Sequence, residues 1–329
     1  MAAMTQFVSG KLAFSAPLTA AHEGPQTVKA PEYLCLYRQK YYGPTLSFFN
    51  EFDRLVLVHG SYVVLDFSDV KELTAAASLM LFAKVTRCQC CLPDIFNYPH
   101  SVVTCKLPKD KAVREVFRRS GLWAAIKPGG EGKLERLWKD WVNPYKTGND
   151  PSSQIGEIIE QLLQQTGGKL PRKIVAALQE SYLNIAHHAY EGFKKGPIPL
   201  HDFMVGRWWQ FVKWNPKTHR MSLVLYDMGM GIPQSLREVG CTVSVADSDC
   251  ACIAMAMKSG VTRFSIQGRG RGFNDIKSPI DVNASAEYLL VFSGAGLVVY
   301  SSGKKVEEKL HDFSIGGTLI EWTFSGVGK

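Results

Sequence analysis

The side chains best suited to chemistry lie on one predicted helix in the C-terminal half of the chain. Glu180, Asn184 and His188 recur at every fourth position, so they share one face of a helix expected between Pro171 and Tyr190. A carboxylate, an amide and an imidazole together can move protons and bind a hard cation. A solvated helix face is the ordinary explanation of such a stripe, so its meaning depends on the other motifs.

A second group follows a predicted strand, Met221 to Tyr226. Asp227 stands at the end of this strand, and Gly229 and Gly231 follow it in a turn where glycine permits positive φ and close approach of a ligand. A carboxylate can accept the exocyclic amine of adenine but would oppose the carbonyl oxygen of guanine. We therefore expect Asp227 to select adenine.

Two further motifs offer groups that bind phosphate and base. A glycine-rich loop opens a predicted helix, and its backbone amides and arginines suit phosphates; it consists of Gly268, Arg269, Gly270, Arg271 and Gly272. Gly317 and Thr318 precede a strand that runs to Phe324, where the Thr318 hydroxyl would join Asp227 at the base.

In chain order these four motifs resemble the nucleotide-binding boxes of the GHKL ATPases. This family includes histidine kinases, anti-sigma serine kinases, type II topoisomerases, mismatch-repair ATPases and Hsp90 chaperones. The resemblance covers Ile155 to about Phe324 and implies an α/β sandwich with ATP between a helical layer and a flexible lid. It also implies that Asn184 coordinates Mg²⁺, that Asp227 reads adenine with help from Thr318, and that the glycines of loop 268–272 wrap the phosphates.

The same resemblance gives Glu180 the catalytic position. In ATP-hydrolysing members this carboxylate activates water, whereas in serine kinases it serves a protein hydroxyl, so an ATPase and a serine/threonine kinase both stay open. The run from Asn184 to Tyr190 is most similar to the anti-sigma kinase branch. His188 is either a group that supports the nucleotide site or a structural residue.

Between the second and third motifs lies the expected lid. Residues 251–258 predict a short helix, and the flexible stretch 259–263 after it suits closure over phosphates, with Arg263 as a phosphate contact. Upstream, the alternating aromatics of segment 191–220 favour an extra hairpin in the core over a stacking surface; they are Trp208, Trp209, Phe211 and Trp214.

The composition divides the chain into two α/β domains. Residues 143–154 are dense in Pro, Gly, Asn, Asp and Ser and predict a linker, with one domain at 1–142 and the other at 155–329. Residues 55–126 alternate strand and helix patterns and resemble the STAS domain of anti-sigma-factor antagonists. That family's phosphorylated serine falls on Ala75 or Ala76 here, and Thr74 fits a helix N-cap, so we expect a scaffold.

Several other sites and locations are disfavoured. No Gly-x4-Gly-Lys-Ser/Thr motif is present, and the cysteines around Cys88 lack the paired Cys-x2-Cys spacing of zinc knuckles. Eight scattered cysteines in a long chain suit reduced thiols and a cytoplasmic location. The longest apolar stretch, Leu55 to Phe67, is too short and too interrupted to span a bilayer, so no membrane association is expected.

The net charge of +8 suits ATP, nucleic acid or an acidic protein surface and chooses none of them. The sequence predicts a Mg-ATP-binding bacterial regulatory protein whose lid closure controls a protein partner. An ATP-operated clamp on nucleic acid and a nucleotide sensor without turnover are the alternatives. A homodimer is left open, and nucleic acid is a less favoured partner than protein.

Overall fold

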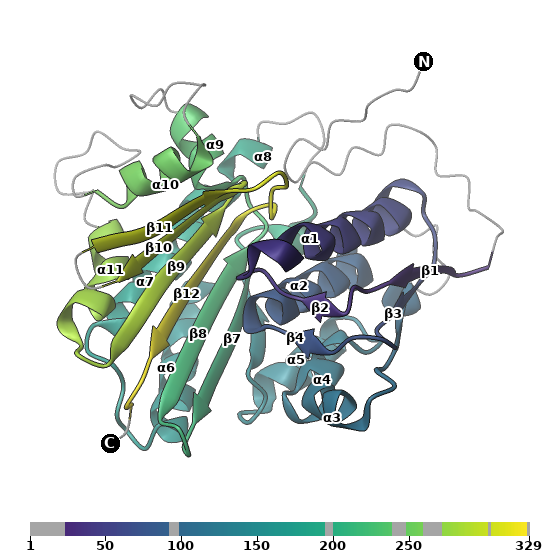
Figure 1. The fold of residues 1–329 in the computed structure, drawn as a ribbon, viewed down its shortest axis with the longest axis horizontal. Coiled ribbons are helices and arrows are strands. Elements are labelled where there is room, and N and C mark those ends of the chain that lie inside the picture. The colour runs from purple at the N-terminus through teal and green to yellow at the C-terminus, as the bar shows by residue number, and fades with distance from the viewer. Residues whose placement is uncertain are drawn as a thin grey trace.

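The computed structural model of the chain describes residues 24–91, 99–194, 200–238, 248–258, 272–301 and 304–327. These residues form a mixed α/β fold with a seven-stranded, a three-stranded and a two-stranded sheet (Figure 1). Throughout this part of the chain, no helix combines the length and the apolar character that a bilayer-spanning segment requires.

The seven-stranded sheet has the order β11-β10-β9-β12-β8-β7-β6, and every neighbouring pair is antiparallel. Strand β12, the last in the sequence, therefore lies in the middle of the sheet, between β8 and β9. The strands are β6 Tyr145–Gly148, β7 Trp208–Asn215, β8 Arg220–Asp227, β9 Ala286–Ser293, β10 Gly296–Ser301, β11 Lys304–Leu310 and β12 Thr318–Phe324.

Helices α7 and α11 pack side by side on one face of this sheet, and α6 lies against α7. Trp322 of β12 donates its indole N–H to the carbonyl of Ile276 in α11 at 2.8 Å, which ties helix and strand together. The helices of this half are α6 Pro151–Gln165, α7 Ile174–Asn184, α8 Glu191–Lys194, α9 Gly231–Glu238, α10 Asp249–Ala256 and α11 Gly272–Val282; a π-helical turn, Ile185–Ala189, continues α7.

We call residues 24–142 the N-terminal module. Its small sheet has the parallel order β1-β3-β5, and β2 pairs with β4. The strands are β1 Gln26–Lys29, β2 Tyr33–Leu34, β3 Val63–Asp66, β4 Glu72–Leu73 and β5 Val103–Lys106, and the helices are α1 Gln39–Asp53, α2 Ala75–Cys91, α3 Lys111–Arg119, α4 Leu122–Ile126 and α5 Glu131–Lys139.

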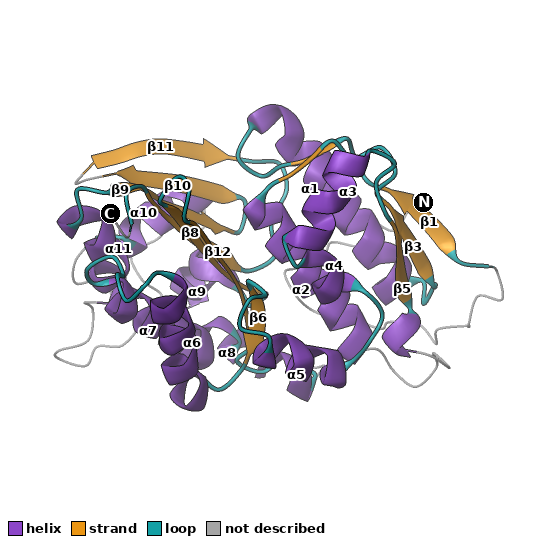
Figure 2. Ribbon diagram, turned by 90° about the horizontal axis from the view of Figure 1, so that it is seen from below, coloured by secondary structure: helices purple, strands orange, loops and turns teal. Residues whose placement is uncertain are grey.

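Helices α1 and α2 lie between the small sheet and the large one (Figure 2). They cover the face of the large sheet opposite to α7 and α11. The Tyr37 hydroxyl donates to Glu321 of β12 at 2.6 Å, and the Tyr145 hydroxyl of β6 donates to Ser78 of α2 at 2.9 Å. One continuous hydrophobic core runs through both parts of the chain.

The strand predicted over Met221 to Tyr226 and the strand predicted to run to Phe324 are confirmed as β8 and β12, with small shifts at their ends. The alternating aromatics lie in the single strand β7, which forms a hairpin with β8, and Trp208 and Trp209 are fully buried. The lid helix predicted over 251–258 corresponds to α10. The helix predicted to reach Tyr190 differs, because its α-helical part ends at Asn184.

The prediction of a linker at residues 143–154 is wrong. Its middle forms β6, the edge strand of the large sheet, and Pro151 is the first residue of α6. Lys146 of β6 is buried and donates to carbonyls at the C-terminal end of α5, including those of Trp138 at 3.0 Å and of the C-cap residue Asp140 at 2.6 Å. Turn-forming residues there mark the two ends of a short strand, which composition alone cannot distinguish from a flexible connection.

The beginning of α2 also differs from the expected N-cap. The Thr74 hydroxyl donates to the Leu34 carbonyl at 3.3 Å instead of accepting a backbone amide. The hydroxyl of Tyr37 accepts the N–H of Ala76 at 3.2 Å in its place. A residue distant in sequence thus caps the helix, a contact that no local pattern encodes.

Candidate functional site

The register of the large sheet places three polar side chains at one end of three adjacent strands. Thr318 of β12 pairs with Asp227 of β8 on one side and with Ser293 of β9 on the other. The hydroxyls of Thr318 and Ser293 lie 2.9 Å apart. The Asp227 carboxylate accepts the backbone N–H of Gly229 at 2.8 Å and that of Thr318. Two motifs separated by about ninety residues, each weak alone, thus meet at one point.

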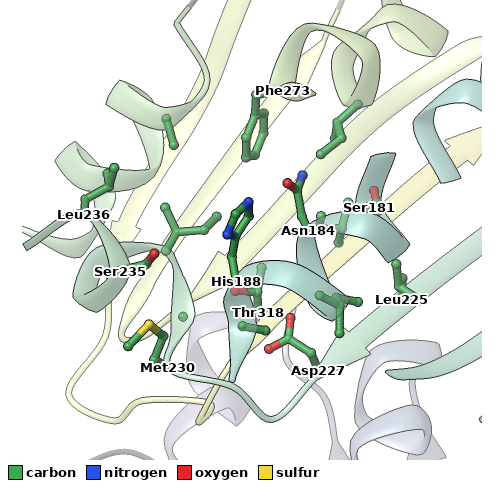
Figure 3. Close-up of a pocket in the computed structure, with 17 residues that line it drawn as sticks. Ser181, Asn184, His188, Leu225, Asp227, Met230, Ser235, Leu236, Phe273 and Thr318 are labelled. Carbon is green, nitrogen blue, oxygen red and sulfur yellow. The ribbon is translucent and has the colours of Figure 1, made fainter. Parts of the chain in front are cut away.

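Two polar side chains of the helical layer face this point. Asn184 ends α7, and His188 belongs to the π-helical turn that follows it. Figure 3 shows both side chains in one pocket with Asp227 and Thr318. In a π turn the hydrogen bonds run from i to i+5, so His188 departs from the α-helical spacing that the sequence predicts; such turns are frequent at functional sites.

The remaining walls of the pocket are mainly apolar. They come from the π-helical turn, from the sheet and the turn after β8, and from α9, α10 and α11, and comprise Ile185, Ala189, Leu225, Met230, Ile232, Leu236, Ala256, Phe273, Ile276 and Ile320. The pocket has a volume of about 170 Å³. Apolar walls with a few fixed polar groups suit a flat heteroaromatic ring that needs both burial and orientation.

The turn after β8 requires glycine at two positions. A Cβ on Gly229 would lie 2.3 Å from the Ala189 carbonyl oxygen, so the turn could not approach the π-helical segment as closely. Gly231 has a φ of +79°, which residues with a side chain rarely adopt. The Met230 N–H donates to the same Ala189 carbonyl at 2.8 Å. This close approach joins the helical side of the pocket to its sheet side.

Burial controls the charge of Asp227. The residue is 4 % exposed, and desolvation raises the pKa of its carboxyl to about 7. The two backbone N–H donors favour the ionised form and oppose part of this shift. A buried carboxyl lacks the water that solvates an exposed carboxyl. A hydrogen-bond donor of a ligand can replace that water, so it stabilises the ionised form of Asp227 more than it would stabilise an exposed carboxylate.

Glu180 lies one helical turn before Asn184 and is half-buried. Burial raises the pKa of Glu180, and the negative charge of Asp275 in α11 raises it further. A hydrogen bond from the Asn184 amide and the charge of His187 lower it. Glu180 does not line the pocket itself, so it stands beside the pocket on the side of α11.

The structure therefore brings together Asn184, His188, Asp227, Gly231 and Thr318 in one pocket. Gly229 does not line the pocket but donates its backbone N–H to the Asp227 carboxylate. Gly272 is the first residue of α11, whose next residue, Phe273, lines the pocket. The other residues of the predicted phosphate loop, Gly268, Arg269, Gly270 and Arg271, and Arg263 of the predicted lid lie outside the described residues.

Sequence reasoning missed three residues of this region. Ser293 is fully buried and its hydroxyl also accepts the N–H of Ile232 at 2.8 Å, but only the strand register shows its place beside Thr318. Phe273 and Asp275 lie just beyond the glycine loop and reach the site because α11 packs on α7. A polar residue before Gly294 at the end of an apolar strand was the only local signal for Ser293.

The cysteines show no metal site in the part of the chain that the structure describes. The seven cysteines there are free thiols, and no three Cys, His, Asp or Glu side chains converge as metal ligands.

Neither a protein-family model nor a curated protein nor a solved structure matches the chain at a significant level.

Proposed function

We propose that the chain is a GHKL-type, Mg-ATP-binding regulatory protein. The observation that carries the proposal is the convergence of Asp227, Thr318, Asn184 and His188 in one apolar-walled pocket between α7 and the large sheet. The four motifs of the sequence and the order of helix, strand and turn around this pocket support the same assignment. The proposed setting is the cytoplasm, and the proposed partner is a protein.

Adenine is the base that the pocket chemistry favours. The exocyclic amine of adenine would donate to Asp227, and apolar side chains such as Leu225 and Ile320 would contact the faces of the ring. Guanine would set its carbonyl oxygen against the Asp227 carboxylate, and both groups are acceptors. The Thr318 hydroxyl, beside Asp227 and Ser293, adds one more group to the edge of the base.

Asn184 fits the role of the single protein ligand of Mg²⁺. Its amide donates to Glu180, which leaves its carbonyl oxygen for a hard cation. Mg²⁺ retains several waters and binds phosphate oxygens, so one amide oxygen is a sufficient protein contribution. The ion would supply charge neutralisation for the phosphates.

Glu180 is the proposed general base. Its pKa is raised by burial and by Asp275, which moves the carboxyl toward the range where a base works at neutral pH. The acceptor of the phosphoryl group is either water or a protein hydroxyl, so the enzyme is an ATPase or a serine/threonine kinase. A STAS-like N-terminal module and a closing lid are the proposed means of controlling a partner.

Equilibrium binding of ATP to the full chain, with and without Mg²⁺, tests the proposal. We expect Asn184→Ala to abolish the Mg²⁺-dependent part of the affinity and Asp227→Asn to reduce the preference for ATP over GTP. Glu180→Gln should bind ATP like the wild type but release no phosphate and transfer no label to a partner. Wild-type ATP binding by both of the first two variants would contradict the site assignment.

A further inference from the structure

The loop between β11 and β12, residues 311–317, contacts helix α1 of the N-terminal module. Tyr42 of α1 is 2 % exposed, and its ring stacks on the His311 ring with centroids 3.5 Å apart and 17° between the planes. The Tyr42 hydroxyl donates to the Phe313 carbonyl at 3.3 Å. The first half of this loop therefore rests on a side chain that belongs to the N-terminal module.

The second half of the loop is held from the large sheet. Tyr226 of β8 donates its hydroxyl to the carbonyls of Ile315 at 2.9 Å and Gly316 at 2.8 Å. Tyr226 precedes Asp227, and successive side chains of a strand point to opposite faces. Asp227 points into the pocket, so Tyr226 points to the face of the sheet that α1 and α2 cover, and there it holds the loop.

The same loop ends in the nucleotide pocket. The carbonyl of its last residue, Gly317, accepts a hydrogen bond from the Ser293 hydroxyl at 3.2 Å. The next residue, Thr318, donates its backbone N–H to the Asp227 carboxylate. A displacement of the loop would therefore move the Thr318 amide that donates to Asp227, together with the Thr318 hydroxyl that pairs with Ser293.

Further hydrogen bonds tie the loop to the expected lid. The His311 N–H donates to the Ala295 carbonyl and the Ile315 N–H to the Gly294 carbonyl, both at 2.9 Å. The Ala295 N–H in turn donates to Asp249, the first residue of α10, at 2.8 Å. Loop 311–317, the β9–β10 turn and the start of α10 form one hydrogen-bonded unit.

We infer that Tyr42 is a positioning residue through which the N-terminal module sets the affinity and the base selectivity of the nucleotide pocket. A shift of α1 against the large sheet moves loop 311–317 and, with it, the Thr318 amide that orients Asp227. Because coupling between two sites is reciprocal, nucleotide binding must stabilise the docked position of α1 to the same extent. The inference rests on the proposed function, since it names the regulation of the same pocket.

A purely structural role of Tyr42 gives a different pattern. Loss of packing alone lowers stability and weakens all nucleotides alike, whereas a misplaced Asp227 also lowers the preference for adenine. Tyr37 supplies a matched control, because it is a second tyrosine at the same interface. Its hydroxyl donates to Glu321 in the middle of β12 and makes no hydrogen bond to loop 311–317 among the described contacts.

The test is isothermal titration of ATP and GTP into the full chain as wild type, Tyr42→Leu, Tyr42→Phe and Tyr37→Phe. We expect Tyr42→Leu to weaken ATP by about 5- to 10-fold, a usual size for coupling between sites, and to reduce the ATP-to-GTP preference. Tyr42→Phe keeps the ring stack and loses only the hydroxyl, so its effect should be smaller and of the same kind. Tyr37→Phe should change neither the ATP affinity nor the ATP-to-GTP preference by more than about twofold, because sites that are far apart usually affect one another only slightly.

Hydrogen exchange of α1 gives a second readout that does not depend on the stability of Tyr42→Leu. ATP should slow the exchange of α1 amides in the wild type and in Tyr37→Phe, and less so in Tyr42→Phe. Folded Tyr42 variants that bind and discriminate nucleotides like the wild type, with equal protection of α1, would overturn the inference alone. A wild-type chain that binds no ATP would overturn the proposed function and this inference together.

Discussion

The decisive single residue is Asp227, because its surroundings give it a charge state that ligand binding can change. Its carboxyl is almost fully buried at the end of β8 and receives two backbone N–H donors. With a pKa raised to about 7, the group is only partly ionised in neutral solution. The ionised form is the stronger acceptor for the amine of the proposed adenine ligand, so binding of this ligand should favour release of the Asp227 proton.

The affinity for ATP should therefore rise as the pH increases from 6 to 8. The gain is expected to stay within about tenfold, the equivalent of one pKa unit of preferential interaction with the ionised carboxylate. Calorimetric titrations at several pH values would measure this rise. The nucleotide phosphates also titrate, so Asp227→Asn is the control: the difference between the two profiles isolates Asp227, and parallel profiles would show that its ionisation plays no part.

At the scale of elements, the site depends on how closely the turn after β8 approaches the π-helical segment after α7. The turn donates the Met230 N–H to the Ala189 carbonyl, and Gly229 leaves no room for a Cβ at this contact. The same turn delivers the Gly229 N–H to Asp227. Two elements with unrelated sequence patterns thus share one backbone contact that fixes both halves of the pocket.

Gly229→Ala should separate these elements and destabilise the protein by about 1–3 kcal/mol, the usual cost of forcing a methyl group into a packed contact. It should also weaken ATP, because the Gly229 amide would leave Asp227. Urea unfolding would measure the loss. Gly156→Ala in α6 is a matched control, because a Cβ there meets open space and should stabilise the helix by ~0.5–1 kcal/mol. Equal stability of the two variants would refute the role of this contact.

At the scale of the whole molecule, the N-terminal module and the large sheet share one core, and a carboxyl is buried between them. Glu321 of β12 is 2 % exposed and accepts the Tyr37 hydroxyl. Burial raises the pKa of Glu321 to about 7, while its hydrogen bonds from Tyr37 and Thr323 and the charge of Arg220 act in the opposite direction. The stability of the folded protein is therefore linked to protonation of this carboxyl.

Glu321 should make the protein less stable as the pH rises from about 4.5 to 7. Across this window the unfolded chain releases the proton of this carboxyl while the folded protein retains it, so the free energy of unfolding falls and then levels off above pH 7. A shift from 4.5 to about 7 corresponds to at most on the order of 3 kcal/mol. Asp227, whose pKa is also raised, contributes with the same sign.

Urea unfolding of the wild type and of Glu321→Gln at pH values from 4.5 to 8 would isolate this carboxyl. The glutamine amide can still accept the Tyr37 hydroxyl but does not titrate, so the variant should lose less stability over the window than the wild type. Identical slopes for the two proteins would contradict a raised pKa at Glu321.

The sequence by itself determined the local elements and the chemical types at their ends. The polar stripe of α7, the carboxylate and glycines after β8, and the aromatic β7–β8 hairpin all follow from periodicity and turn chemistry, which act over a few residues. These signals predict Asn184 and Asp227 as candidate site residues. They failed at residues 143–154, where the turn-forming residues enclose a strand.

Only the tertiary structure decided what those elements do together. The central place of β12 sets Thr318 between Asp227 and Ser293, and no local pattern specifies which strands become neighbours. Burial of Asp227 and Glu321, and hence their raised pKa values, depends on the helices that cover each face of the sheet. The contact of Tyr42 with loop 311–317 likewise exists because α1 docks on that sheet. Strand order, register and desolvation arise from packing between residues distant in the chain, so the sequence supplies the groups and the fold determines their environment.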